Sequence, residues 1–159
     1  MRIVVLGIGS VLMRDDGLGV HLIRVLSREY DFAASIELID GGTSGMELLP
    51  EIASCDLLIA IDAVRASLEP ATLVRLCDEQ VPTFFKTKLS PHQAGLSDIL
   101  ATLTFQCAAP RHVVLIGMQP ADISAGMTLS PLLEAHFGEL VDAVLQEIGN
   151  NGGAPRKRA

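Results

Sequence analysis

Residues 7–19 read GIGSVLMRDDGLG, and they stand between the hydrophobic run Ile3–Leu6 and a segment whose apolar residues recur at helical spacing. This order predicts a strand, a glycine-rich loop and a helix. The loop has leucine where a dinucleotide-binding fingerprint needs glycine, and it lacks the Gly-Lys-Ser/Thr of a P-loop. Its two acids, Asp15 and Asp16, would also repel a phosphate. We therefore expect the loop to bind a cation or a proton.

Strand and helix signals alternate along the rest of the chain, which predicts an α/β sheet with helices on both faces. The expected strands are residues 2–7, 35–39, 56–61, 71–77 and 112–117, and the expected helices are 18–26, 46–53, 96–103 and 131–148. The run 56–61, DLLIAI, is typical of a central parallel strand, whereas Arg75 indicates an edge strand. Residues 82–89 are expected to be irregular.

Composition limits the class of protein and its partners. We expect one domain at residues 1–148 and a disordered tail at 149–159, which is rich in Asn, Gly, Pro and basic residues. The formal net charge of −7 argues against nucleic acid or an anionic membrane as a partner. No apolar run is long enough to cross a membrane, no signal peptide is visible, and the three cysteines form no CxxC pair. A cytoplasmic protein fits these features.

Polar side chains stand at or just after the expected strands. Asp15 and Asp16 follow the first strand, Asp40 ends the second, Asp62 ends the third, and His92 precedes the helix at 96–103. Ligands of open α/β sheets bind outside the carboxyl ends of the strands, so we expect these residues to share one rim. Carboxylates with an imidazole suit a transition metal such as nickel, zinc, copper or iron.

Each of these residues also has a simpler structural explanation. An aspartate after a strand commonly caps a helix or forms a turn, and that is an ordinary role for Asp15, Asp16 or Asp62. His92 alone would most often be a surface histidine. Pro91 after a serine marks a helix start, and the helix dipole there favours the neutral imidazole that a metal ligand needs. The coincidence of several such residues at one rim is what favours a shared site.

Four segments together resemble the NiFe-hydrogenase maturation endopeptidases. They are GIGSVLMRDDGLGV from residue 7, IDGGTSGMELL from residue 39, IDAV from residue 61 and KLSPHQAGLSDIL from residue 88. The stretch IGMQPADISAGMTLSPLL from residue 116 also agrees with the family pattern. The resemblance covers roughly residues 1–148, and the combination of motifs is specific. One departure is Ser10, where the family usually has asparagine.

The resemblance implies a three-layer α/β sandwich, with a twisted, mostly parallel sheet of about five strands between helix layers. It implies an endopeptidase that removes the C-terminal extension of the NiFe-hydrogenase large-subunit precursor after nickel insertion. The family's metal-contacting residues map onto Asp16, Asp62 and His92, and the aspartate of its Asp-Gly-Gly-Thr motif maps onto Asp40. These four are the expected catalytic residues. The precursor is expected to supply the nickel, and the enzyme is expected to be a monomer.

Three other functions stay open at this level. A general metal-dependent hydrolase would turn over small substrates without any hydrogenase precursor. A nickel chaperone or assembly scaffold would bind the large subunit and leave its mass unchanged. A flavodoxin-like nucleotide-binding module is disfavoured by the acidic loop and by the missing phosphate motif.

Overall fold

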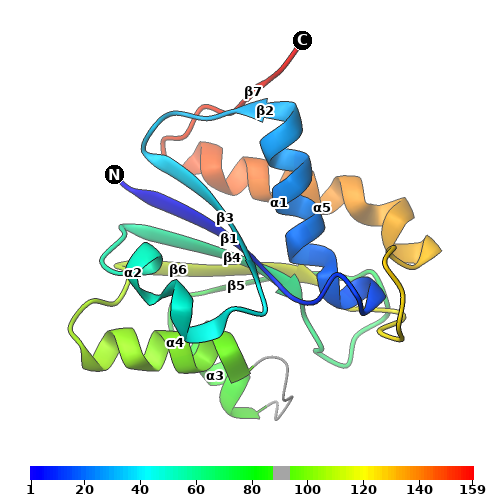
Figure 1. The fold of residues 1–159 in the computed structure, drawn as a ribbon, viewed down its shortest axis with the longest axis horizontal. Helices are drawn as coiled ribbons and strands as arrows, with labels where there is room; N and C mark the ends of the chain where they lie inside the picture. The colour runs from blue at the N-terminus through cyan, green and yellow to red at the C-terminus, as the bar shows by residue number, and fades with distance from the viewer. Residues whose placement is uncertain (88–93) are drawn as a thin grey trace.

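The computed structural model describes residues 1–87 and 94–159. At its centre is a five-stranded sheet in the order β3-β1-β4-β6-β5 (Figure 1). The strands are β1 (Ile3–Ile8), β3 (Ile36–Gly42), β4 (Leu57–Ala63), β5 (Leu73–Cys77) and β6 (His112–Met118). β5 is antiparallel to β6, and the other neighbouring strands are parallel. The mostly parallel sheet and the edge position of Arg75 are therefore confirmed.

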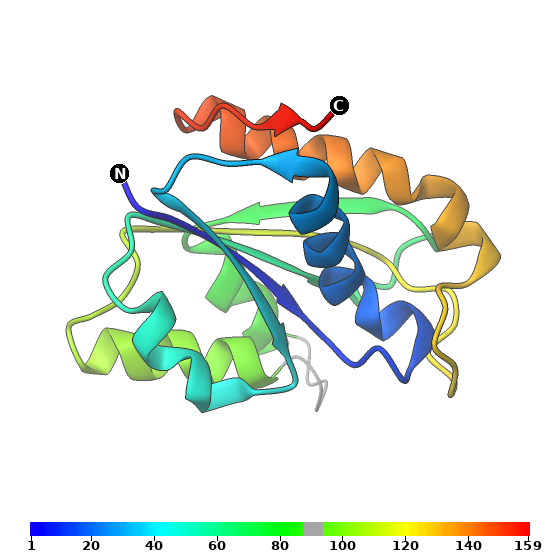
Figure 2. The same cartoon turned by 45° about the horizontal axis from the view of Figure 1, so that its top comes forward.

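Helices cover both faces of the sheet, as the α/β prediction requires (Figures 1 and 2). The helices are η1 (Arg14–Gly17), α1 (Leu18–Glu29), η2 (Gly45–Leu48), α2 (Leu49–Ile52), α3 (Gln80–Thr87), α4 (Ala94–Phe105) and α5 (Pro131–Asn150). α1 and α5 pack on one face, and α2, α3 and α4 pack on the other. Successive side chains of a strand point to opposite faces, so Val5 packs against α1 and α5 while Leu6 packs in the other layer.

The segment before the undescribed residues differs from the prediction. Residues 82–89 are expected to be irregular, yet α3 occupies Gln80–Thr87. Pro82 lies in the first turn of this helix, where a missing N–H costs no intrahelical hydrogen bond. Val81 and Phe85 stand four residues apart and are both buried in the core below the sheet. Proline in so short a segment conceals this helical spacing. Residues 88 and 89 lie outside the described residues.

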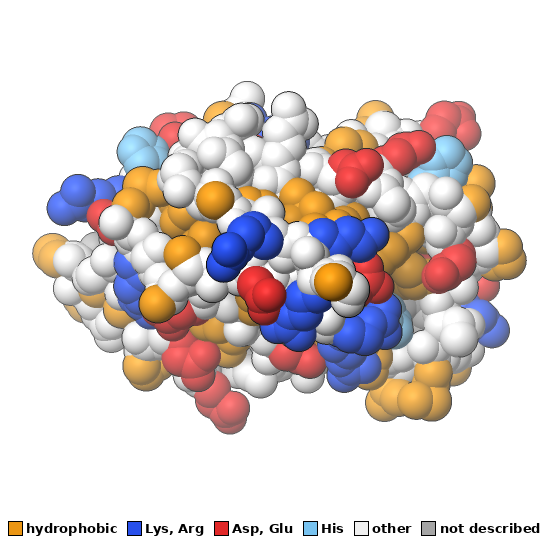
Figure 3. All heavy atoms as spheres, turned by 90° about the horizontal axis from the view of Figure 1, so that it is seen from above, with side chains coloured by type: hydrophobic (Ala, Val, Ile, Leu, Met, Phe, Trp, Pro, Cys, Tyr) orange, Lys and Arg blue, Asp and Glu red, His pale blue; other side chains and the backbone are white. Residues whose placement is uncertain are grey.

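The chain after α5 carries regular structure where a disordered tail is expected. A short strand, β7 (Arg156–Lys157), pairs antiparallel with β2 (Tyr30–Asp31). Nε of Arg158 donates a hydrogen bond of 2.8 Å to Asp31, and its backbone N–H donates one of 2.8 Å to the carbonyl of Glu29. Basic side chains gather on this face of the molecule (Figure 3). That residues 1–148 form the functional domain stays a prediction.

The winding of the chain decides where a ligand would bind. β1 leads through α1 to β3 on one side, and the chain then returns through α2 to β4 on the other side of β1. Such a reversal opens a crevice at the carboxyl ends of the strands. Gly19 lets α1 approach this crevice closely, because a Cβ there would lie 2.1 Å from the carbonyl oxygen of Ile61. In residues 1–87 and 94–159, no helix has the length and apolar character of a membrane span.

Candidate active site

Asp16 lies in η1, at the end of the glycine-rich loop that follows β1, and its side chain is buried. Its Oδ2 accepts a hydrogen bond of 2.9 Å from the backbone N–H of Ser10, which closes the loop. Gly9 has a φ of 124°, and a Cβ there would lie 1.8 Å from the carbonyl oxygen of Asp16. Only glycine meets both conditions. The loop thus holds the Asp16 carboxylate at the carboxyl end of β1, as the sequence predicts.

The neighbouring carboxylate, Asp15, is fully buried and has a structural role. Its Oδ2 accepts hydrogen bonds from the N–H groups of Ala121 (2.9 Å) and Asp122 (2.8 Å) and from the hydroxyl of Ser130 (2.8 Å). Its Oδ1 accepts a bond of 2.7 Å from the N–H of Ser130. Asp15 therefore ties the loop before α5 to the loop after β1. Among the described side chains, none caps the first turn of α1.

Asp62 stands near the end of β4, and its side chain is also buried. It lies on the same face as Leu58 and Ala60, toward α3 and α4. Its Oδ1 accepts a bond of 2.8 Å from the N–H of Ala63 and lies 3.6 Å from the point that a Cβ on Gly9 would occupy. Asp62 thus faces the loop that holds Asp16.

Burial raises the pKa of Asp62 well above its ordinary range, and the negative charge of Asp16 raises it further. The N–H of Ala63 and the guanidinium of Arg65 lower that pKa, but they do not outweigh the two larger effects. Two neighbouring buried carboxylates favour either a shared proton or a bound cation. The charge distribution therefore fits the cation that the sequence predicts for this loop.

A pocket of about 210 Å³ opens beside Asp16. Its walls come from the ends of β1 and β3, from η2 and from the start of α4, with Ile8, Leu48, Leu96 and Ile99 as the apolar side chains. Gly9, Gly42 and Gly45 line it with backbone only. Exposed backbone and an apolar wall suit an extended peptide segment next to a carboxylate.

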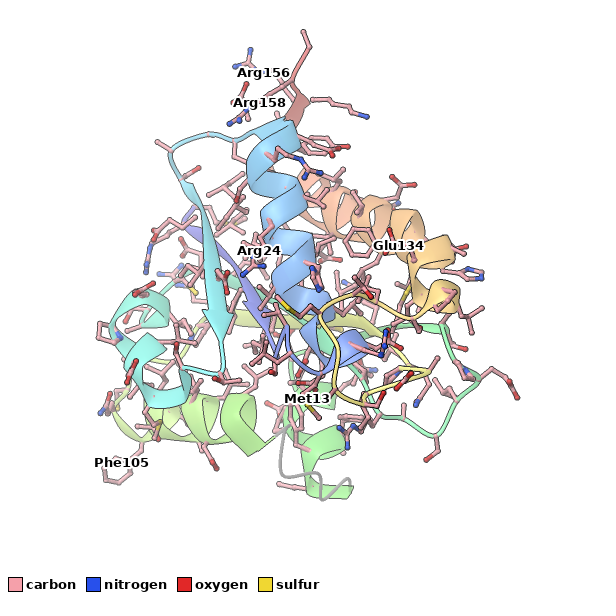
Figure 4. All side chains as sticks on the ribbon, turned by 45° about the vertical axis from the view of Figure 1, so that its right-hand side comes forward. Met13, Arg24, Phe105, Glu134, Arg156 and Arg158 are labelled. Atoms are coloured by element: carbon pink, nitrogen blue, oxygen red, sulfur yellow. The ribbon has the colours of Figure 1, made fainter. Side chains whose placement is uncertain are left out.

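Asp40 lies on the face of the sheet opposite to that of Asp62. It pairs in register with Gly7 of β1, on the side covered by α1. Its side chain is 43% exposed, and its Oδ2 lies 3.6 Å from Nε of Arg24. Arg24 extends from α1 toward β3 (Figure 4). The structure therefore places Asp40 at the expected rim of the sheet but does not bring it into the pocket with Asp16.

His92 lies outside the described residues, so the third expected metal ligand has no position here. The residues that follow it begin α4, and Gly95 and Leu96 line the same pocket as Asp16. Within residues 1–87 and 94–159, no group of three or more His, Cys, Asp or Glu side chains is arranged to hold a metal ion. The described part of the expected ligand set is the pair Asp16 and Asp62.

Sequence reasoning missed two residues beside this pair. Arg65 acts on the charge of Asp62, and Gln119 holds the backbone around Arg65. The only signal for Arg65 is its place three residues after Asp62 in a strand-end motif. Gln119 directly follows β6, which is the same strand-end position that singled out the acids.

Comparisons with known proteins identify the family of this chain. Residues 20–147 match the family model HycI, hydrogenase maturation protease. The chain is 39% identical over 153 residues to the hydrogenase 2 maturation protease of Escherichia coli (strain K12), across 96% of this chain and 93% of that protein.

Two solved structures show the same fold. The hydrogenase maturating endopeptidase HybD from E. coli is 38% identical, with a TM-score of 0.94 over 99% of this chain and 98% of that one. The [NiFe] hydrogenase maturation protease HybD from Thermococcus kodakarensis is 25% identical, with a TM-score of 0.77 over 92% of this chain and 99% of that one. The family model and these relatives thus identify a peptidase. The chain belongs to the hydrogenase maturation protease family.

Proposed function

We propose that this peptidase removes the C-terminal extension of a NiFe-hydrogenase large-subunit precursor once nickel has been inserted. The observation that carries the proposal is the buried pair Asp16 and Asp62, of which Asp16 lines a pocket with an exposed backbone wall. The family supplies the process, hydrogenase maturation by proteolysis. The name of the thermococcal relative supports a NiFe enzyme as the target.

Nickel belongs to the substrate in this proposal. Asp16, Asp62 and His92 would complete the coordination of a nickel ion that the precursor already holds, because carboxylate and imidazole are suitable ligands for it. The two carboxylates repel one another when buried, and a docking cation removes that repulsion. A precursor without nickel brings no cation and therefore cannot relieve the repulsion between Asp16 and Asp62. Selectivity for the loaded precursor follows from the same charges that make the empty site unfavourable.

The residues of the chain have distinct parts in the cleavage. The N–H of Ser10 holds Asp16 in place, and Asp62 with its raised pKa can hold a proton until the cation arrives. When present, nickel can polarise a carbonyl or a water molecule. Asp40, on the α1 face with Arg24, is proposed to orient the precursor at the rim. We also propose that the enzyme acts as a monomer in the cytoplasm.

The test is the intact mass of a cognate large-subunit precursor, loaded with or without nickel, after incubation with the protein. The expected result is the loss of one C-terminal peptide from the nickel-loaded precursor only. Asp16→Asn, Asp62→Asn and His92→Ala are each expected to slow this loss by about 100-fold or more. Asp142→Asn, at an exposed aspartate of α5, is the matched control and is expected to process normally.

Three outcomes would overturn the proposal. Full processing by all three site variants would show that Asp16, Asp62 and His92 do not form the active site. A stable complex with the nickel-loaded precursor and no change of mass would favour an assembly scaffold. Turnover of short peptides without any precursor would favour a general metal-dependent hydrolase.

A further inference from the structure

The loop after β4 is held rigidly beside Asp62. Oε1 of Gln119 accepts hydrogen bonds from the N–H groups of Ala66 (2.8 Å) and Leu68 (3.2 Å). Gln119 directly follows β6, the strand that pairs with β4 along its whole length. One side chain therefore fixes residues 64–68 relative to the carboxyl ends of two central strands.

Arg65 projects from this loop with part of its guanidinium buried. Among residues 1–87 and 94–159, its Nη2 atom is buried and has no hydrogen-bond partner. The guanidinium lies close enough to Asp62 to lower the pKa of that carboxyl. A buried donor without an acceptor costs free energy, and native structures rarely keep one without a reason. An acceptor that arrives with the substrate and draws the guanidinium toward it would supply such a reason.

Arg65 faces a hollow of about 260 Å³, which it lines together with Ser67, Gln119 and residues 120–123. Because Oε1 of Gln119 is engaged by the loop, this residue offers the hollow its amide NH2 group. Both polar groups presented by Arg65 and Gln119 are thus hydrogen-bond donors. Donors with a positive charge suit an anion, and the planar guanidinium fork suits a carboxylate.

Asp122 also lines the hollow, but its carboxylate is occupied within its own loop. Oδ1 accepts bonds from the N–H (2.8 Å) and the hydroxyl (2.6 Å) of Ser124, and Oδ2 lies 3.7 Å from Nε of Arg14. These donors compensate the charge of Asp122. The positive charge of Arg65 therefore stays available to a ligand in an otherwise acidic protein.

We propose that Arg65 determines substrate specificity by binding a carboxylate of the precursor's C-terminal extension next to the Asp62 site. The proposal rests on the proposed function, because it needs a peptide substrate that passes this rim. The carboxylate can come from the end of the extension or from an acidic side chain within it. Both sources present the same planar anion to the guanidinium.

The test compares wild type, Arg65→Met and Arg65→Lys on the nickel-loaded precursor, with kcat and KM measured separately. Arg65→Met keeps an unbranched stem without the charge, so we expect KM to rise about 10- to 100-fold. Because Arg65 also acts on the charge of Asp62, kcat is expected to fall as well, but by a smaller factor than the rise in KM. Arg65→Lys is expected to recover only part of the loss, because it lacks the bidentate fork. Arg111→Met, at an arginine whose side chain is 80% exposed, is the matched control.

Two altered precursors identify the source of the carboxylate. In one, each Asp or Glu of the extension becomes Asn or Gln, and in the other, two added glycines displace the terminal carboxylate. With wild-type enzyme, one of these precursors is expected to raise KM as Arg65→Met does, and Arg65→Met is expected to be insensitive to that same change. This coupling distinguishes binding from a structural effect on Asp62. The KM of each altered precursor with wild-type enzyme can be measured even if Arg65→Met folds poorly.

Unchanged kinetics in Arg65→Met, with active wild type, would overturn the role of Arg65 and leave the proposed function intact. A fall in kcat without a change in KM, or a rise in KM that neither altered precursor reproduces, would also overturn it. Failure of the wild-type enzyme to process the nickel-loaded precursor would overturn the proposed function and this inference together.

Discussion

Asp15 and Asp16 are neighbours in the chain, but their carboxylates have different partners. Asp15 accepts four hydrogen bonds from the loop before α5, and Asp16 accepts one from Ser10 and faces the pocket. A carboxylate whose oxygens already accept several hydrogen bonds has little left to offer a ligand. The residue with fewer donors is therefore the one suited to bind a cation.

The burial of Asp62 leads to a prediction at the same scale. In the protein without metal, its carboxylate is buried beside Asp16, and both circumstances raise its pKa. Asp62→Asn removes the charge and keeps the shape of the side chain. We expect the free energy of unfolding near pH 7 to rise by about 1 kcal/mol, as is common when a functional site is relieved of such a cost. For a chain of this length, Tm would rise by about 2–4 °C.

If the buried charge of Asp62 is the cause, the stabilisation by Asp62→Asn must depend on pH. A carboxyl whose pKa is raised by folding costs the fold nothing below its ordinary pKa of 3.8, where folded and unfolded states both hold the proton. The cost grows as pH rises past that value. The advantage of Asp62→Asn is therefore expected to be largest near neutral pH and to vanish as pH falls toward about 4. Thermal unfolding of wild type and Asp62→Asn measures it, and lower stability of the variant near pH 7 would contradict the prediction.

Which candidate residues converge could be predicted only in part. The strand-end rule correctly places Asp16, Asp40 and Asp62 at one rim of the sheet, since it depends on local strand signals and parallel pairing. The face on which a side chain lies depends on register with a distant strand. Asp40 pairs with Gly7 and so faces α1, and nothing within the motif around Asp40 reveals this. The position of Arg65 depends in the same way on a distant residue, because Gln119 accepts a hydrogen bond from the loop that carries Arg65.

At the scale of elements, long segments with a strong pattern were predictable and short ones were not. α5 begins after Ser130, as expected, and the Ser130 hydroxyl accepts a hydrogen bond of 3.4 Å from the N–H of Leu133. β7 has two residues and so no periodicity that could reveal it. Its order comes from backbone pairing with β2 and from the contact of Arg158 with Asp31, both of which join distant parts of the chain.

The position of β7 predicts the effect of removing it. β2 follows the carboxyl end of α1, whereas Asp16 immediately precedes the amino end of that helix. Deletion of residues 154–159 is therefore expected to lower the free energy of unfolding by about 1 kcal/mol or less, since it removes a short exposed pairing. Processing of the precursor is expected to stay within about twofold of wild type.

Denaturant unfolding and the intact-mass assay would check the deletion together. Arg158→Ala is the matched control, because it removes the side-chain contact with Asp31 and leaves the backbone pairing of β7 and β2 in place. It is expected to be less destabilising than the deletion. A loss of processing in the deletion variant at full stability would show that the tail contributes to the precursor interface.

At the scale of the whole molecule, the two cores on either side of the sheet determine which groups meet solvent only on unfolding. Cys55 is fully buried in the core of α2, α3 and α4, while Cys107 is exposed. Burial raises the pKa of the Cys55 thiol to about 11. Near pH 8, only roughly one in a thousand of these thiols would be ionised, and the thiolate is the reactive form.

Cys55 is therefore expected to report on global unfolding. With iodoacetamide near pH 8, peptide mass mapping should show rapid modification of Cys107 and protection of Cys55, and protection should be lost with urea in parallel with the unfolding transition. Because the folded state keeps its proton up to a higher pH, stability is expected to fall as pH rises from the ordinary thiol pKa of 9.0 toward about 11. Cys55→Ala should flatten that fall, although the cavity lowers its stability overall. Equal rates of modification at Cys55 and Cys107 in the native protein would show that this core opens without global unfolding.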